Sequence, residues 1–243
     1  MIITRPEDTL HKLQLFRLLT EIADTPILSA ALYFKGGTAA SMLGYLDRFS
    51  VDLDFDLKPG SETKALRYEF HRLFTHIGLQ LDDESKRALL FFLKYDSPKG
   101  QRNTLKLDAV SGVWKANRYE PKRLSEIDRT LVCETKETMV SNKLVAPLDR
   151  WKKHKKIAGR DIYDIHSFLS HGYRYIPEIL TERTGLPAKG FFRTLVSFIE
   201  KRVTERIITE DLNTLLIADT FQNVRKTLVR ETIMLLREEY ERW

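Results

Sequence analysis

Three aspartates alternate along one short stretch of the sequence. Asp52, Asp54 and Asp56 are separated by the apolar residues Leu53 and Phe55. In a β-strand such alternate side chains share one face, and the Cα atoms of the first two aspartates would be about 6.6 Å apart. Carboxylates held this close repel one another, and a hard divalent cation that prefers oxygen ligands, such as Mg²⁺, would neutralise them. The stretch therefore predicts a strand with one buried face and one acidic, metal-binding face.

A glycine turn precedes this acidic strand. Gly36, Gly37 and Thr38 open a short helical segment that leads to Arg48 and Ser50. Glycines allow backbone N–H groups to approach a phosphate closely, and a helix that begins there favours negative charge. Two glycines alone are usually only a turn, and an acidic strand end is often only solvated. The order of glycine turn, helix and acidic strand instead indicates a joint metal and phosphate site for phosphoryl or nucleotidyl transfer.

The residues around the turn have different expected roles. The glycine turn, with Thr38, is expected to cradle phosphate. Ser50 shares the acidic face and suits either a phosphate contact or a bond that fixes a carboxylate. Arg48 suits a phosphate contact and equally a structural bond to the aspartates. Asp56 is expected to support the site rather than to bind metal.

Two blocks of the sequence resemble a known family. The pattern GG-T…RFS-x-DLDFD at residues 36–56 resembles the nucleotidyltransferase signature of the DNA polymerase β-like superfamily. With the preceding lysine, KGGTA…RFSVDLDFD is similar to the AbiEii/AbiGii family of abortive-infection toxins. A second stretch at residues 137–169, ETMVSNKLVAPLDRW…AGRDIYDIHSFL, resembles that family's second block, K…R…RD-x-YD. The resemblance spans residues 34–169.

This resemblance implies a fold and a function. The fold would be α+β, a nucleotidyltransferase-like mixed sheet with flanking helices, followed by a C-terminal helical bundle. The function would be that of a nucleotidyltransferase toxin of a toxin–antitoxin pair. It would use Mg²⁺, or Mn²⁺, to transfer nucleotides from a nucleoside triphosphate to an RNA acceptor, the 3′ end of tRNA, and a cognate antitoxin would counter it.

The same resemblance supplies further site residues. The superfamily pattern places a third carboxylate on a later strand, and Asp108 in the segment TLKLDAV is the candidate for a metal ligand and activator of the attacking hydroxyl. Lys106 shares its face of that strand. In the second block the resemblance carries over to Lys143, as a charge for the triphosphate, and to Asp161, as a residue that orients Lys143 or the nucleotide. Asp164 lies three residues further on, and the sequence leaves open which of the two acids serves the nucleotide.

Composition sets bounds on the class of protein. The chain has 243 residues, of which 42% are hydrophobic and 30% charged, as in an ordinary globular protein. We expect no signal peptide and no membrane span, because the first residues are amphipathic and no apolar run reaches about 20 residues. The single Cys133 excludes an intrachain disulfide, and the histidines show no metal-ligand spacing. We therefore expect a cytoplasmic protein.

The positive charge is concentrated in one run. The formal net charge is +6, which favours a polyanionic partner. The densest basic run joins the two halves of the second block and predicts an RNA contact, with a solvated helix end as the alternative. Its lysines are Lys152, Lys153, Lys155 and Lys156.

Hydrophobic periodicity divides the chain near residue 133. Residues 1–133 are expected to form the nucleotidyltransferase-like core, a sheet of about four or five strands that includes segments 27–34, 50–57, 88–95 and 104–110. Helices are expected there from Pro6 onward and at residues 38–46 and 62–78. Residues 134–243 are expected to form a helical domain that completes the active site, with helices at 137–149, 161–170, 191–205 and 211–243.

Other functions fit part of this pattern. The same chemistry could serve transfer to a small molecule or to a protein hydroxyl. A protein of another class, a catalytically degenerate regulator that binds nucleic acid, would need none of the acidic residues. The intact aspartates and glycine turn favour an enzyme.

Overall fold

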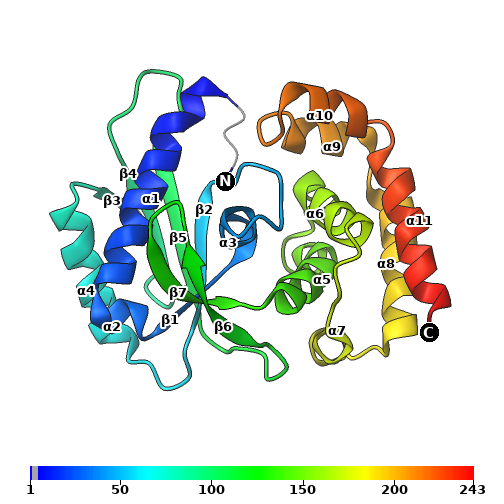
Figure 1. Ribbon diagram of the computed structural model, residues 1–243, viewed down its shortest axis with the longest axis horizontal. Helices are drawn as coiled ribbons and strands as arrows, with labels where there is room; N and C mark the ends of the chain where they lie inside the picture. Colours follow the sequence, from blue (N-terminus) through cyan, green and yellow to red (C-terminus); the bar gives the residue numbers. More distant parts are fainter. Residues whose placement is uncertain (2–4) are drawn as a thin grey trace. The chain divides into compact units, whose positions relative to one another are not determined.

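The computed structural model describes residue 1 and residues 5–243, which form two compact units. The first unit comprises residues 1–113 and 119–134, and the second comprises residues 114–118 and 135–243. The short segment 114–118, which the division at residue 133 places in the first domain, is bonded within the second unit. There the backbone N–H of Arg118 donates to Thr138 Oγ1, and the amides of Lys115 and Ala116 donate to the carboxylate of Glu182. Figure 1 shows the course of the chain.

A mixed seven-stranded sheet forms the first unit, in the order β3-β4-β5-β2-β1-β7-β6. The central strands β1 and β2 are antiparallel, while β2 and β5, and β1 and β7, are parallel. The strands are β1 (Leu32–Lys35), β2 (Asp52–Leu57), β3 (Gln80–Glu84), β4 (Leu89–Lys94), β5 (Thr104–Val110), β6 (Tyr119–Leu124) and β7 (Arg129–Glu134). The α+β fold expected from the sequence is confirmed.

Burial on β2 follows the alternation read from the sequence. Leu53 and Phe55 are fully buried, while Asp52 and Asp54 on the other face remain partly exposed. The helices of this unit are α1 (Thr9–Asp24), α2 (Pro26–Ser29), α3 (Gly36–Met42) and α4 (Thr63–His76), with a short 3-10 turn at Pro6–Asp8. Helix α1 packs on α2, α4, β2, β5 and β7, whereas α3 packs on β1 and β2.

Two expectations for this unit were wrong in detail. The segment 27–34 was expected to be a strand, but its first part is helix α2. Pro26 supplies a fixed φ at the first helical position, and the amides of Leu28 and Ser29 bond to Thr25 O. The strands β3, β6 and β7 were not expected at all. Strand β3 is largely exposed and polar, and β6 contains Pro121 at an edge of the sheet, so neither shows apolar alternation.

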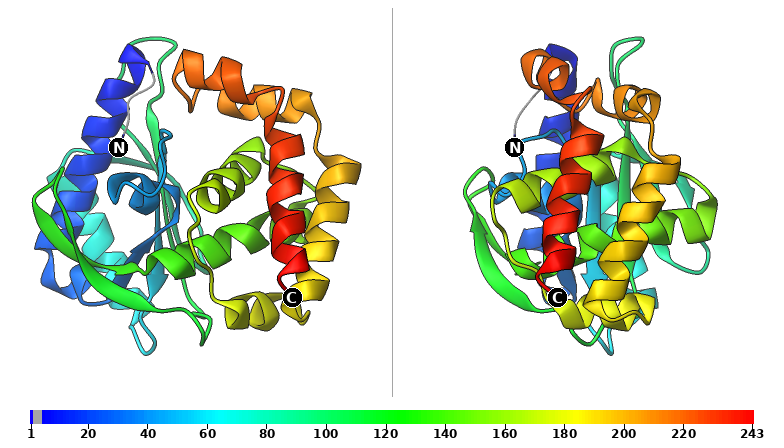
Figure 2. Two further views of the ribbon diagram at one scale, coloured as in Figure 1. Left: turned by 45° about the vertical axis from the view of Figure 1, so that its right-hand side comes forward. Right: turned by 90° about the vertical axis from the view of Figure 1, so that its right-hand side faces the viewer.

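The second unit is helical. Helices α8 and α11 run side by side, and α6 packs on α5, α9 and α11 (Figure 2). The helices are α5 (Lys136–His154), α6 (Gly159–Ser170), α7 (Pro177–Thr184), α8 (Ala188–Arg202), α9 (Glu205–Leu212), α10 (Ala218–Val224) and α11 (Leu228–Glu241). The segment 211–243 was expected to be one helix but comprises the end of α9 and all of α10 and α11. The chain turns after Leu212 and again near Thr227, because buried Leu215, Leu216 and Leu228 lie off any single helical stripe.

Among the residues that the structure describes, no helix has both the length and the apolar character to cross a membrane.

Candidate active site

Two parallel strands bring the expected carboxylates together. In the register of β2 and β5, Asp54 lies opposite Asp108 and Asp52 lies opposite Lys106. Laterally paired residues of a pleated sheet point to the same face, so the carboxylates of β2 and β5 share one side of the sheet. The sequence expectation required Asp108 to face the same way as Asp52 and Asp54, and the register satisfies it. The result is an acidic cluster, which we define as Asp52, Asp54 and Asp108.

Lys106 is a member of this site to which sequence reasoning gave no role. Its Nζ lies 3.1 Å from Asp108 Oδ2. Burial disfavours the charged form of Lys106, but attraction by Asp54, Asp108 and Asp52 outweighs it, so the pKa of Lys106 is raised. Its spacing of two residues from Asp108 on the same strand was the available signal.

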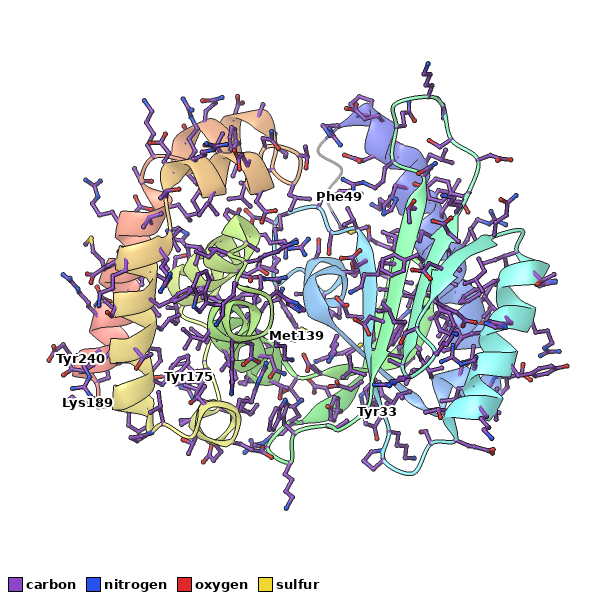
Figure 3. All side chains as sticks on the ribbon, turned by 180° about the vertical axis from the view of Figure 1, so that it is seen from behind. Tyr33, Phe49, Met139, Tyr175, Lys189 and Tyr240 are labelled. Carbon is purple, nitrogen blue, oxygen red and sulfur yellow. The ribbon has the colours of Figure 1, made fainter. Side chains whose placement is uncertain are left out.

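Asp56, at the far end of the acidic strand, is committed to structural contacts. Its carboxylate accepts hydrogen bonds from Lys35 Nζ at 2.5 Å and from Tyr119 Oη at 2.6 Å. The tyrosine ring stacks on Tyr33, labelled in Figure 3, with centroids 4.2 Å apart. Burial lowers the pKa of Lys35, but Asp56, Glu134 and Asp54 raise it by more, and the net shift is upward. Asp56 therefore joins β1, β2 and β6, in keeping with its expected supporting role.

The glycine turn lies directly against the acidic cluster. Gly36 has a φ of +80°, and a Cβ added there would be 2.5 Å from Asp54 Oδ2. A Cβ on Gly37 would be 2.9 Å from both Arg48 Nη2 and Ser50 Oγ. Both glycines are needed because side chains close in on the turn from two directions. The carboxylate of Asp54 approaches Gly36, whereas the hydrogen-bond donors Arg48 and Ser50 approach Gly37.

The polar residues of this turn also build its framework. Thr38 is 1% exposed, and its hydroxyl donates to the backbone oxygen of Asp52 at 2.5 Å. Arg48 is 2% exposed, and its Nη1 donates to Phe49 O at 3.0 Å, while Ser41 Oγ donates to Arg48 O. These bonds fix the start of α3 against the start of β2. The hydrogen bond from the Thr38 hydroxyl to Asp52 O thus helps to position the acidic strand.

A buried histidine holds the residue before the acidic strand. His11 Nε2 lies 2.9 Å from Val51 O, and Nδ1 lies 2.7 Å from Tyr95 Oη. Burial lowers the pKa of His11 to about 4, so the ring is neutral near pH 7. A carbonyl can only accept, so we assign the proton to Nε2. The ring also contacts Phe49, labelled in Figure 3. Nothing in the spacing of His11 marked this role.

In the second unit, two ion pairs join α5 to α6. Lys143 Nζ lies 2.7 Å from Asp164 Oδ2, and Arg150 binds both oxygens of Asp161, at 2.7 and 3.2 Å. Both aspartates are buried. The sequence left open which of the two acids serves Lys143, and in the structure it is Asp164 that holds Lys143. Lys143 and Arg150 are two helical turns apart on α5, and Asp161 and Asp164 are about one turn apart on α6. The earlier base pairs with the later acid, so the order of the pairs reverses between the two helices.

The basic run occupies the end of α5 and the two residues that follow it. Lys152, Lys153, Lys155 and Lys156 are exposed, and the part of the chain that the structure describes places none of them in an ion pair. Nearby, Arg202 at the end of α8 stacks on Trp151 with its guanidinium carbon 4.0 Å from the ring centroid. These cations belong to the second unit, and the acidic cluster belongs to the first.

The acidic cluster has the donor chemistry of a Mg²⁺ site. Within residue 1 and residues 5–243, no three Asp, Glu, His or Cys side chains are grouped closely enough to hold a metal by themselves. Protein Mg²⁺ sites commonly use only one or two carboxylates, with substrate phosphates and water as the remaining ligands. The carboxylates of Asp52 and Asp54, beside the glycine turn, fit that pattern.

Comparison with known proteins gives the family. The family model described as "Nucleotidyl transferase AbiEii toxin, Type IV TA system" matches residues 17–234. The fold is similar to JHP933 from Helicobacter pylori, with a TM-score of 0.58 and 20% identity over 98% of this chain and 94% of that one. It is also similar to a proposed nucleotidyltransferase from H. pylori, with a TM-score of 0.57 and 19% identity over 98% and 96% of the two chains. No curated protein matches the sequence. The chain, a nucleotidyltransferase, belongs to the AbiEii toxin family of type IV toxin–antitoxin systems.

Proposed function

We propose that this protein transfers a nucleotide from a nucleoside triphosphate to RNA, with Mg²⁺ or Mn²⁺ bound by the acidic cluster. The register of β2 and β5 carries the proposal, because it aligns Asp54 with Asp108 beside Asp52 and the Gly36 turn. An isolated acidic strand would have no reason to meet a second aspartate on a neighbouring strand. Nor would it need a glycine where an added Cβ would come within 2.5 Å of its carboxylate.

Asp52 and Asp54 would bind the metal. Asp108 is not grouped closely enough with them in this structure to complete a three-carboxylate site, and it would join as the third ligand only when the cation is bound. When bound, the cation would neutralise charge on the attacking and leaving oxygens. Asp108 is also proposed, from the superfamily resemblance, to accept the proton of the attacking hydroxyl. The chain's own contribution is to hold these carboxylates on adjacent, hydrogen-bonded strands, so that little reorganisation is needed during transfer.

The triphosphate would lie against the glycine turn. The backbone N–H groups of Gly36, Gly37 and Thr38 are the proposed phosphate donors, and Ser50 and Arg48 flank the same turn. Thr38 contributes through its backbone, since its hydroxyl is bonded to Asp52 O. Arg48 also adds positive charge close to the turn, which favours an anionic ligand.

We propose that Lys143 of the helical unit binds the triphosphate, as the family resemblance implies. Its side chain is 19% exposed, and the fully buried Asp164 orients it. Among the acids left open by the sequence, Asp164 is therefore the better candidate for a residue that acts through Lys143. Asp161 would act through Arg150. Either pair offers a cation for a triphosphate on a rigid two-helix support.

RNA is the acceptor that the charge distribution favours. A surface suited to a phosphate backbone is formed by the exposed Lys152, Lys153, Lys155 and Lys156, with Arg202 close by on Trp151. The 3′ end of tRNA is proposed from the family resemblance alone. A cognate antitoxin is implied by the toxin–antitoxin family, and we propose the cytoplasm as the place of action because triphosphates and tRNA are found there.

One experiment identifies the acceptor. The purified protein is incubated with total RNA and each α-labelled triphosphate in turn, with Mg²⁺ or with EDTA. The proposal expects one RNA class to lengthen, with tRNA the species, and only with metal present. Label on protein or in small molecules instead would favour the alternative acceptors. Absence of any incorporation, with RNA still bound, would favour a degenerate regulator.

A further inference from the structure

Lys106 lies among the carboxylates of the acidic cluster. Lys106 is paired in register with Asp52, and its Nζ is 3.1 Å from Asp108 Oδ2. Its side chain is 32% exposed, so the ammonium is partly withdrawn from water but still reaches the open face. In this arrangement one positive charge on β5 offsets part of the negative charge gathered from β2 and β5.

This ammonium competes with a metal for the same oxygens. Mg²⁺ binds carboxylate oxygens at about 2.0–2.1 Å. A divalent cation on the oxygen that Lys106 now contacts would lie within a few ångströms of the ammonium. Like charges at such a separation repel strongly even at an effective dielectric constant of about 20. Both cations cannot keep the same contacts.

We propose that Lys106 is an exchangeable counter-ion that holds the carboxylates in the metal-free protein and turns to the triphosphate when metal occupies the cluster. This inference rests on the proposed function, since it takes Asp52, Asp54 and Asp108 as metal ligands. A lysine suits the exchange because its ammonium is a point charge on a flexible four-carbon stem, with donors that accept any direction. When Lys106 leaves the carboxylate of Asp108, the phosphates of the incoming triphosphate become the anions that its ammonium contacts. Lys106 is thus a positioning residue for both the carboxylates and the nucleotide.

The test separates metal binding from catalysis. Mn²⁺ binding to the full chain without nucleotide is measured by the loss of the free Mn²⁺ signal in electron paramagnetic resonance. Binding of a non-hydrolysable triphosphate analogue is measured by calorimetry at saturating Mn²⁺. For Lys106→Met, we expect Mn²⁺ to bind on the order of tenfold more tightly, because a competing charge is gone. The analogue should bind more weakly, by a similar factor.

These opposite signs distinguish the exchange from a structural role. A lysine that only stabilises the fold would weaken both affinities together or leave both unchanged, and either result would overturn the inference. The matched control is Lys94→Met. Lys94, on the neighbouring strand β4, also pairs with an aspartate, Asp82 Oδ1 at 2.6 Å, which is not a member of the cluster. It should change neither affinity. If Lys106→Met fails to fold, Lys106→Gln is measured in the same way.

A further variant separates failure of this inference from failure of the metal site. Asp54→Asn should abolish Mn²⁺ binding. If Asp54→Asn binds Mn²⁺ as the unchanged protein does, the proposed metal site is wrong. If Asp54→Asn removes binding while Lys106→Met leaves the Mn²⁺ affinity unchanged, the metal site stands and the role of Lys106 falls.

Discussion

Some residues that serve the proposed chemistry of this protein are unfavourable for its stability. Clustering Asp52, Asp54 and Asp108 on one face of the sheet is unfavourable for folding, and it is tolerated because Lys106 and Lys35 provide compensating charge. The sequence identified Asp52 and Asp54 through their alternation, which is a local pattern, and Asp108 through the family resemblance. The lysines were not assigned, because their importance depends on which strands become neighbours.

The close approach of the glycine turn to Asp54 gives a prediction with an internal control. Gly36→Ala should destabilise the fold through both the positive φ and the clash with Asp54. Gly60→Ala meets the positive φ alone, because Gly60 has a φ of +83° and nothing within 4 Å of an added Cβ. We expect Gly60→Ala to cost about 1 kcal/mol and Gly36→Ala roughly 1–2 kcal/mol more, by urea denaturation. Equal costs would show that Asp54 does not press on the turn.

The bonds that link helices and strands to one another are made by side chains whose partners no sequence pattern marks. Helix α1 is bonded to the residue before β2 through His11, and α5 is bonded to α6 through two ion pairs. Periodicity predicted each of these helices and strand β2, although their bounds shift by a few residues. It could not predict the bonds between them, because those depend on packing between segments distant in sequence. For the same reason the sequence left open whether Asp161 or Asp164 serves Lys143, and the structure pairs Lys143 with Asp164.

The buried histidine predicts a specific pH dependence. The pKa of His11 is about 4 in the folded protein against 6.5 in its unperturbed state. Below pH 6.5 the unfolded chain therefore binds a proton that the folded chain does not, so stability is full above pH 6.5 and falls as the pH drops toward 4. The loss attributable to this group should be about 2 kcal/mol at pH 5 relative to pH 8.

Chemical denaturation across pH checks this contribution. In His11→Gln the part of the decline that His11 causes between pH 6.5 and 4 should disappear, whatever the stability of the variant at pH 8. His76→Gln, at an exposed position on α4, should retain the full decline. If His11→Gln keeps the same slope as the unchanged protein, His11 is not the titrating group.

The pair between α5 and α6 separates structural from functional roles of Lys143. Lys143→Met should cost about 2–3 kcal/mol, because it leaves the buried Asp164 without this cation. Lys143→Met combined with Asp164→Leu should recover stability to within about 1 kcal/mol, since an apolar pair can replace a buried ion pair. Transfer activity should stay lost in the double variant if Lys143 serves the triphosphate.

A control comes from another ion pair of the helical unit. Arg183 Nη2 binds Asp149 Oδ2, and the pair has no role in the proposed site. Arg183→Met with Asp149→Leu should leave the rate of transfer within about twofold of the unchanged protein. Full activity in the Lys143→Met, Asp164→Leu variant would make Lys143 purely structural.

At the scale of the whole molecule, the sequence predicted the class of fold and much of its central sheet, but not its edges. Strands β2, β4 and β5 were expected close to their observed positions because buried alternation marks them. The edge strands β3 and β6 were missed because solvent-facing edges lack that alternation, and β7 was missed beside them. The division into two units was likewise predicted only from the change from mixed to helical periodicity near residue 133.

The distribution of charge predicts how the molecule binds RNA. Changing Lys152, Lys153, Lys155 and Lys156 to Gln should weaken RNA binding and flatten its dependence on salt. With each phosphate contact that is lost, fewer counterions are released from the RNA on binding. The slope of log K against log salt should fall by about 0.7–0.9 for each lysine that contacts a phosphate. The measurement is a salt series of RNA-binding isotherms.

A charge-matched variant shows whether the location of these lysines matters. Lys58, Lys64, Lys86 and Lys99 are exposed lysines of the first unit, and changing them to Gln removes the same net charge. This variant should bind RNA nearly as the unchanged protein does. If both sets reduce the salt slope equally, only net charge matters and the basic run has no special role.

The central claim is that the carboxylates on β2 and β5 perform nucleotidyl transfer, and one comparison of rates tests it most directly. Incorporation of α-labelled triphosphate into RNA is measured for the unchanged protein, for Asp54→Asn and for Asp96→Asn, which makes the same change at an exposed position of the same unit. We predict that Asp54→Asn slows transfer by about a thousandfold, equivalent to about 4 kcal/mol in the barrier, while its melting temperature is retained. Asp96→Asn should transfer at the unchanged rate. A folded Asp54→Asn protein that incorporates nucleotide as fast as Asp96→Asn would contradict the account.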